Sequence, residues 1–394
     1  MDSISQICDT SIDETLAALE QKIPRSPDDE QVQKDASEKV TRLRRWLEEN
    51  CFDSVLITRR DNFAWLTVGG SSHVLRNTEF GAGNLLITPD HQYVLGYSMD
   101  VDRILEEEVP GQGYAGRSIH WYQGDPRMQA LELGGKRIAA DTALPGMEDC
   151  ALSISRMHGG LTVLELNRLR WLAHKSALLL EAIAQWLRPR MTERNVGQML
   201  LAVYALNGIE LDVIIVGSDE RLAKFRHAVP SDKQIERCVM FHPAARRWGL
   251  HANVNRFVSF GKPDLRFEKA HNAAVTIEAH VLGEMKAGNR FADILNKQKQ
   301  WYAQYGYPEE WKLHFQGGTT GYLVGDASLC LTDARIENNT AFDWFITVNG
   351  IQVEELTILT PQGVEVASMG NKWQTIPVET AGGFISVPKM RIME

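Results

Sequence analysis

The sequence predicts a mixed α/β protein, in the broad α+β sense, made of two folded domains. Helical and strand-like segments alternate over residues 37–160, which is typical of an α/β domain. Two helix pairs then precede strand-rich segments in residues 161–394, which indicates a second domain with two similar halves. The chain has 394 residues, enough for two or three domains. Residues 1–36 are polar, and we expect an N-terminal extension there, part helix and part linker.

The first domain is expected to open with a helix that begins at Ser37. Apolar residues recur there with helical spacing and share one face; they are Val40, Leu43, Trp46 and Leu47. Two apolar runs follow, Ser54–Thr58 and Asn62–Val68, and each has the composition of a buried strand. We therefore predict a strand at both.

A hairpin and a further strand complete the prediction for this domain. Asn84–Thr88 and Gln92–Tyr97 flank the turn-forming residues Pro89-Asp90-His91, which indicates two strands joined by a tight turn. Arg137–Ala140, followed by Asp141, has the pattern of the end of a strand.

The second domain is expected to start near Thr162 with a long helix that ends at about Leu187. Thr192 has the position and chemistry of an N-cap for the next helix. Residues 187–196 and 285–294 are weakly similar, and each would end one helix and begin another. This short repeat suggests two related halves, each with a helix pair and antiparallel strands.

The composition of the chain argues against nucleic acid and membranes as binding partners. The net charge is −9 with both signs interspersed, which argues against nucleic acid, because phosphate binding needs a basic patch. The five cysteines are scattered and odd in number, which favours reduced thiols and a cytoplasmic location. We expect neither a signal peptide nor a membrane partner, because no apolar run reaches the roughly 20 residues of a membrane span.

Three spaced segments carry the chemistry. The first is Phe225–Pro230, which places His227 three residues before Pro230; the others are Gly249–Arg256 and Gly350–Glu355. In this order and spacing they resemble the creatinase, aminopeptidase P and prolidase family, peptidase family M24, over about residues 37–394. The resemblance implies a creatinase-like N-terminal domain at 37–160 and a pita-bread domain at 161–394.

The resemblance also implies where the ligands of a two-metal site would stand. The two aspartate positions fall on His242 and Asn253, and the Gly-His-Gly histidine falls on Gly318. The Glu-Pro position falls on Phe345, or on Asp343 if the register moves, and the last glutamate is Glu354. A two-metal site needs several carboxylates to hold and bridge the cations. We therefore expect a divergent member that lacks most of the metal ligands and binds neither metal nor other cofactor.

Histidine and carboxylate chemistry remain available to such a site. His227 is the expected general acid and base, since histidine exchanges protons near neutral pH, and Glu354 would position substrate or water. The further candidates are substrate-binding residues: His242, Arg247, Asn253, His314, Gln316, Glu355 and Asp343. Structural roles stay open for several of these, including a salt bridge from Glu355 to Arg256 and a solvated turn at Arg247. The absent histidine at Gly318 would leave volume for a ligand.

Three functions are compatible with these residues. The first is a metal-independent, creatinase-like enzyme that acts on a small polar or dipeptide-like molecule, by C–N bond hydrolysis or a related proton transfer. The second is a non-catalytic pseudo-peptidase that binds a peptide or metabolite. The third is an Xaa-Pro-type metallopeptidase with an unusual site. The resemblance further implies a homodimer.

Overall fold

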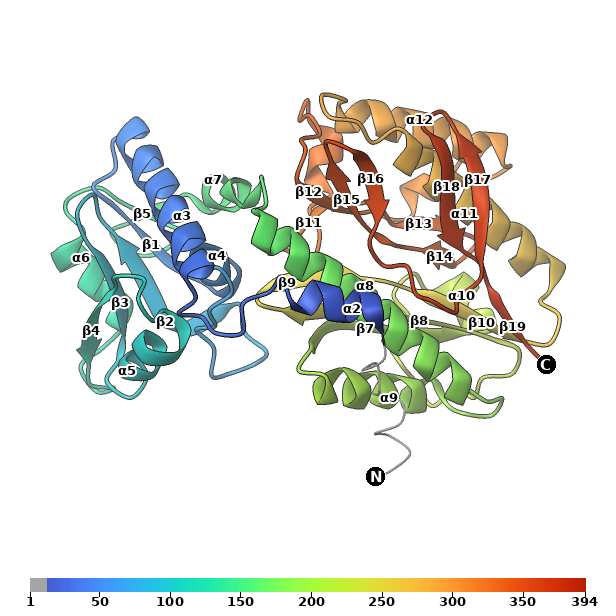
Figure 1. Cartoon of the computed structure of the whole chain (residues 1–394), viewed down its shortest axis with the longest axis horizontal. Coiled ribbons are helices and arrows are strands. Elements are labelled where there is room, and N and C mark those ends of the chain that lie inside the picture. Colours follow the sequence, from blue (N-terminus) through green and yellow to red (C-terminus); the bar gives the residue numbers. More distant parts are fainter. Residues whose placement is uncertain (1–12) are drawn as a thin grey trace. The chain divides into compact units, whose positions relative to one another are not determined.

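The computed structural model describes residues 13–394, and Cys8 lies outside them. The chain divides into two compact units (Figure 1). One unit contains residues 20–165 together with 248–250, and the other contains residues 166–247 and 251–394 together with the described residues before 20.

The helices of the described chain are α2 Glu14–Glu20, α3 Glu30–Glu49, α4 Arg60–Leu66, α5 Val101–Arg103, α6 Ala130–Leu133, α7 Ala151–Ser155, α8 Val163–Trp186, α9 Glu193–Leu206, α10 Glu220–Lys224, α11 Leu265–Gly283 and α12 Phe291–Gln304. Helix α3 begins at Glu30, seven residues before the predicted start, because the Asp29 carboxylate caps it by accepting from the backbone N–H of Gln31. Part of the expected N-terminal extension is therefore helical.

The 20–165 unit is built on a six-stranded mixed sheet. Its strands are β1 Ser54–Arg59, β2 Phe80–Ile87, β3 Gln92–Tyr97, β4 Ala115–Ile119, β5 Ile138–Ala140 and β6 Glu148–Asp149, in the spatial order β4-β3-β2-β1-β5-β6. Strand β2 pairs antiparallel with β1 and β3, which confirms the predicted hairpin. Strand β5 pairs parallel with β1, which confirms the predicted strand near Arg137.

The predicted strand at Asn62–Val68 is wrong, because Arg60–Leu66 forms the helix α4. Phe63, Ala64, Trp65 and Leu66 are all buried, so this run carries no polar alternation to reveal its period. A short, fully buried apolar run cannot be assigned to helix or strand from hydrophobicity alone. The contact that fixes the helix start is non-local: the Asn62 side chain donates to Asp141.

The other unit contains two helix pairs, α8 with α9 and α11 with α12. Helix α8 and the N-cap at Thr192 confirm the sequence prediction; Thr192 and Asn195 form a reciprocal capping box. The weakly repeated segments at 187–196 and 285–294 each lie where one helix of a pair ends and the next begins.

Strands of this unit form several small sheets. They are β7 Glu210–Ser218, β8 Cys238–Arg247, β9 Leu250–Asn253, β10 Arg256–Phe260, β11 Gly318–Thr320, β12 Thr340–Asp343, β13 Ile346–Val348, β14 Ile351–Val353, β15 Leu356–Thr360, β16 Gly363–Val366, β17 Thr375–Thr380, β18 Gly383–Pro388 and β19 Arg391–Met393. One sheet has the order β19-β10-β8-β7 with β9 on β8, another has the order β11-β12-β15-β16, and β13-β14 and β17-β18 are separate ribbons.

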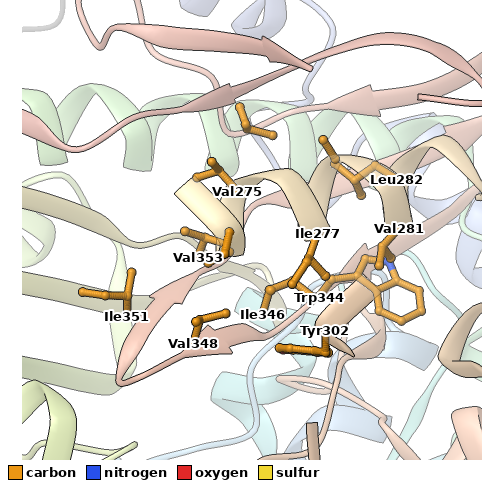
Figure 2. Close-up of a cluster of buried hydrophobic side chains, with 14 of the residues drawn as sticks. Val275, Ile277, Val281, Leu282, Tyr302, Trp344, Ile346, Val348, Ile351 and Val353 are labelled. Carbon is orange, nitrogen blue, oxygen red and sulfur yellow. The ribbon is translucent and has the colours of Figure 1, made fainter. Parts of the chain in front are cut away.

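The main core of this unit lies between α11 and the strand ribbons (Figure 2). Helix α11 contributes Val275, Ile277, Val281 and Leu282, and it contacts β13, β14, β17 and β18. Trp344, directly after β12, is fully buried in the same cluster. This apolar core therefore packs directly against strands that neighbour the candidate site.

Candidate functional site

Three site residues stand where a strand is interrupted. Asn253 ends β9 before the break that precedes β10, and Asp343 ends β12 before the break that precedes β13. Glu354 lies in the break between β14 and β15. The three side chains lie in one buried cluster with His242 of β8.

The cluster is held by direct contacts. The Asn253 amide donates to the Asp343 carboxyl group and, at 2.9 Å, to the carbonyl oxygen of Val324. Gln352 Nε2 donates to Glu354 Oε2 at 2.6 Å, and His242 Nε2 lies 3.4 Å from the same oxygen. We call His242, Asn253, Asp343 and Glu354 the buried polar cluster.

Burial decides the protonation of this cluster. Glu354 is completely buried, and the loss of hydration raises its pKa to about 8. Burial also raises the pKa of Asp343 well above its ordinary value, and the neighbouring Glu354 charge adds to the effect. Burial lowers the pKa of His242 to about 4. At neutral pH Glu354 is therefore largely protonated and His242 is neutral, and burial favours the protonated form of Asp343.

Apart from the hydrogen bonds that join the Glu354 carboxyl group to Asp343 and Asn253, several atoms of the buried polar cluster have no hydrogen-bond partner among residues 13–394. They are both ring nitrogens of His242, Oδ1 of Asn253, Oδ1 of Asp343 and Oε1 of Glu354. Buried polar atoms in folded proteins are nearly always paired, and each unpaired one costs about 1–3 kcal/mol. This concentration of unpaired atoms at one place is what a site for a polar group looks like.

A second pair of side chains lies within electrostatic reach of the cluster. His227 Nε2 and His314 Nε2 are 3.0 Å apart. His314 Nδ1 lies 2.5 Å from the carbonyl oxygen of Phe315, which can only accept, so this nitrogen carries the proton. In the neutral pair His314 Nε2 is then the acceptor, His227 Nε2–H is the donor, and His227 Nδ1 is left as the basic nitrogen.

The pKa values of both histidines are lowered. Desolvation is the main cause for each, and the neighbouring imidazoles add to it, with His242 acting on His227 and on His314. The two histidines thus lie within electrostatic range of His242, which itself lies 3.4 Å from Glu354. His227 lies outside regular secondary structure.

Gln316 lies next to this group and is fully used inside the protein. Its Nε2 donates to the carbonyl oxygens of Trp311 (3.1 Å) and His314 (2.8 Å), and its Oε1 accepts from Gln298. These bonds fix the segment that presents the His314 ring. Gln316 is therefore placed to position His314 and has no free donor to offer a substrate.

Two other candidate residues are not brought into the buried polar cluster. Arg247 is five residues beyond His242 on β8, about 17 Å along an extended strand, and its guanidinium stacks 4.5 Å from the Trp171 ring. Glu355 pairs with Arg256 and accepts from Ser368 Oγ at 2.5 Å. Both carboxylate oxygens of Glu355 are thus engaged, in the salt bridge that the sequence left open.

Glu278 carries no signal in the sequence. This residue of α11 is buried, neither of its carboxyl oxygens has a hydrogen-bond partner among residues 13–394, and burial raises its pKa well above the ordinary value. The charges of Glu355 and Glu354 act on it in the same direction. A glutamate at a helix position with alternating alanines looks like a surface residue until the strands packed against the helix are known.

The side chains at the implied metal-ligand positions do not fit a pair of divalent cations. Only Asp343 and Glu354 supply carboxylates at the implied ligand positions, and no group of three or more His, Cys, Asp or Glu in metal-binding arrangement occurs within residues 13–394. At Gly318 a Cβ atom would lie 1.8 Å from the carbonyl oxygen of Asp326. The volume expected beside Gly318 is therefore filled by backbone, and that expectation is wrong.

Comparison with known proteins identifies the family and the fold. The family model "Metallopeptidase family M24" matches residues 167–353. A search of curated proteins finds no match. Among solved structures, Xaa-Pro dipeptidase from Bacillus anthracis matches with 20% identity and a TM-score of 0.69, covering 91% of this chain and 100% of the other.

Two further solved structures share the fold. Prolidase from Pyrococcus horikoshii OT3 matches with 17% identity and a TM-score of 0.71, over 85% of this chain and 99% of the other. The N-terminal domain of FACT complex subunit SPT16 from Eremothecium gossypii matches with 12% identity and a TM-score of 0.61, over 85% of this chain and 96% of the other. The pita-bread architecture predicted for the second domain is confirmed.

Proposed function

The chain belongs to metallopeptidase family M24, and from that premise we propose that it is a metal-independent hydrolase of C–N bonds in small polar or dipeptide-like molecules. The observation that carries the proposal is the His227–His314 pair, which lies within electrostatic range of His242 in a buried cluster where burial raises the pKa of both acids. Metal independence rests on the donor set, which offers two carboxylates and no place for a side chain at Gly318.

The first step is proton removal from water by the histidine pair. His227 Nδ1 accepts a proton from the attacking water, and the charge that appears on the imidazole is stabilised by the bond from His227 Nε2–H to His314 Nε2. The water oxygen bonds to the carbon of the C–N group. The proton then passes from His227 to the leaving nitrogen as the C–N bond breaks.

The protonated acids would stabilise the charge that forms on the substrate oxygen. A carboxylic acid kept neutral by burial donates a hydrogen bond that a carboxylate cannot. Asp343 and Glu354 hydrogen-bond to each other, and in this proposal one of the two acids turns its proton toward the substrate oxygen. His242, neutral at pH 7 because its pKa is lowered to about 4, is a second neutral donor or acceptor there.

Dipeptides are included in the substrate class because solved relatives of the same fold are a dipeptidase and prolidases. A homodimer and a reducing, cytoplasmic location are retained as parts of the proposal. Four of the cysteines, Cys51, Cys150, Cys238 and Cys330, are free thiols. Separately, no helix within residues 13–394 has the length and hydropathy needed to cross a bilayer.

The test is a substrate screen on chelator-treated protein, with dipeptides and creatine-like guanidino compounds. His227→Gln is expected to lower kcat by roughly 100-fold or more, since a positioned general base contributes about 10²–10⁴. His314→Gln should lower kcat less, and the exposed His120→Gln serves as the matched control. Metal analysis of untreated protein accompanies the screen.

Two outcomes would overturn this proposal. Turnover that requires a stoichiometric divalent cation would favour the Xaa-Pro-type metallopeptidase. Dipeptide binding that survives in His227→Gln, without turnover in either protein, would favour the non-catalytic binding module.

A further inference from the structure

A groove in the 20–165 unit is independent of the site described above. Its volume is about 650 Å³, within the roughly 300–1,000 Å³ of small-molecule sites. One wall is α3, and the other is formed by the turn and strand at Asp90–Tyr93 and by Gly111–Ala115. All of its lining residues belong to this one unit.

The α3 wall is a polar stripe with a cation near each end. Lys34, Ser37, Thr41 and Arg44 line the groove, and their spacing of three, four and three places them on one helix face. Arg44 Nε donates to the carbonyl oxygen of Thr88 at 3.0 Å, which orients the guanidinium. Its two terminal nitrogens have no hydrogen-bond partner among the described residues, so they can serve a carboxylate.

The opposite wall contains two polar atoms that have no hydrogen-bond partner within the described part of the chain. The Tyr114 hydroxyl and Gln112 Oε1 are both buried and unpaired, and both residues line the groove. Burial raises the pKa of Tyr114, so its hydroxyl stays a donor. Gln112 Nε2 is held by the carbonyl oxygen of Thr67 at 3.1 Å, which leaves Oε1 as an acceptor in a fixed position.

The charges that line the groove balance. Lys34 and Arg44 are matched by Glu30 and Asp90, so neither a bare anion nor a bare cation is favoured overall. Donors for a carboxylate, from Arg44 and Tyr114, stand beside acceptors for an ammonium or amide N–H, from Gln112 and the two acids. We propose that this groove binds a small zwitterion, a free amino acid or short peptide, with its carboxylate at Arg44.

The test uses the full chain carrying His227→Gln, so that binding at the proposed catalytic site is not followed by turnover. Glycylglycine and L-phenylalanine are titrated calorimetrically, with L-phenylalaninamide and inorganic phosphate as comparison probes. Arg44→Gln is expected to weaken zwitterion binding by at least 10-fold and Tyr114→Phe by several-fold. Arg45→Gln, an exposed neighbour on the same helix that does not line the groove, is the matched control.

Supporting results are a loss of affinity in Arg44→Gln but not in Arg45→Gln, a further loss when the ligand carboxylate is an amide, and hydrogen-exchange protection of residues 111–115 by ligand. Equal affinity in the two arginine variants would overturn the proposal, as would no binding of either zwitterion at 20-fold molar excess in the millimolar range. Phosphate binding without zwitterion binding would also overturn it, in favour of a simple anion site.

Discussion

At the residue scale, the site depends on which groups hold protons. The histidine pair must be neutral to act as a base, and its pKa values lie below the ordinary value of about 6.5 because of burial and mutual repulsion. Glu354 must keep its proton to act as a donor, and its pKa is about 8. The two requirements overlap around neutral pH, so the neutral pair and the protonated acid coexist there.

We therefore expect a bell-shaped dependence of kcat/KM on pH. Activity should fall on the acid side, as the pH drops through the pKa of the histidine pair, which burial lowers below the ordinary value. It should also fall as the pH rises through about 8, where Glu354 ionises. In Glu354→Gln the amide still donates but cannot ionise, so the alkaline limb should disappear and the acid limb should remain. An unchanged alkaline limb in this variant would contradict the assigned role of Glu354.

Gly318 stands at the position where the family resemblance places a ligand histidine. A Cβ at Gly318 would collide with the carbonyl oxygen of Asp326, which is backbone and cannot rotate away. Gly318→His should therefore destabilise the protein, by roughly 3 kcal/mol or more in urea denaturation, and should not create a metal site. Zinc-dependent stabilisation of this variant would show that the segment can move aside. Gly159→Ala, where a Cβ has room, is the control and should stay within about 0.5 kcal/mol.

At the scale of elements, the close packing of the β17–β18 ribbon against α11 depends on Gly283, the last residue of the helix. A Cβ at Gly283 would lie 2.4 Å from Thr380 Oγ1 and 2.7 Å from Thr380 Cβ. Helix propensity alone favours alanine over glycine by about 1 kcal/mol. The collision outweighs that gain, so Gly283→Ala should lose about 1–3 kcal/mol of stability, measured by chemical denaturation. A stability gain would mean that the ribbon is not held against α11.

Elements with a strong local signal could be predicted from the sequence. The helical spacing of α8, the N-cap at Thr192 and the turn between β2 and β3 all lie within short windows, and the structure confirms them. The segment at Asn62–Val68 could not be assigned, because its burial removed the alternation that distinguishes a strand from a helix. Glu278 gave no signal, because its burial is set by strands more than 60 residues away.

At the scale of the whole molecule, stability should depend on histidines buried in both units. His158 lies in the 20–165 unit and His271 in the other, and burial lowers the pKa of each to about 4. A histidine whose folded pKa is depressed favours the folded state above about pH 6.5, and this contribution is lost as the pH falls toward 4. Both units should therefore lose stability in mild acid.

His271→Leu tests this expectation, because the His271 ring makes an edge contact with Phe257 and has no side-chain hydrogen bond to any of the described residues. At pH 7 the variant should be within about 1 kcal/mol of the wild type. At pH 4.5 it should be more stable by roughly 2–3 kcal/mol, since about 1.4 kcal/mol corresponds to each unit of pKa difference. Urea denaturation at both pH values provides the comparison, and an equal difference at the two pH values would contradict a buried neutral His271.

The sequence by itself determined the two-domain plan, the M24 resemblance and the depletion of metal ligands, because these depend on local periodicity and on motif spacing. Only the tertiary structure decided which candidates meet. In the structure Asp343 contacts Glu354, whereas Glu355 pairs with Arg256 and Arg247 stacks on Trp171. The space beside Gly318 is filled by backbone. Those outcomes depend on where strands break and which side chains then face one another, which the spacing of residues along the chain does not fix.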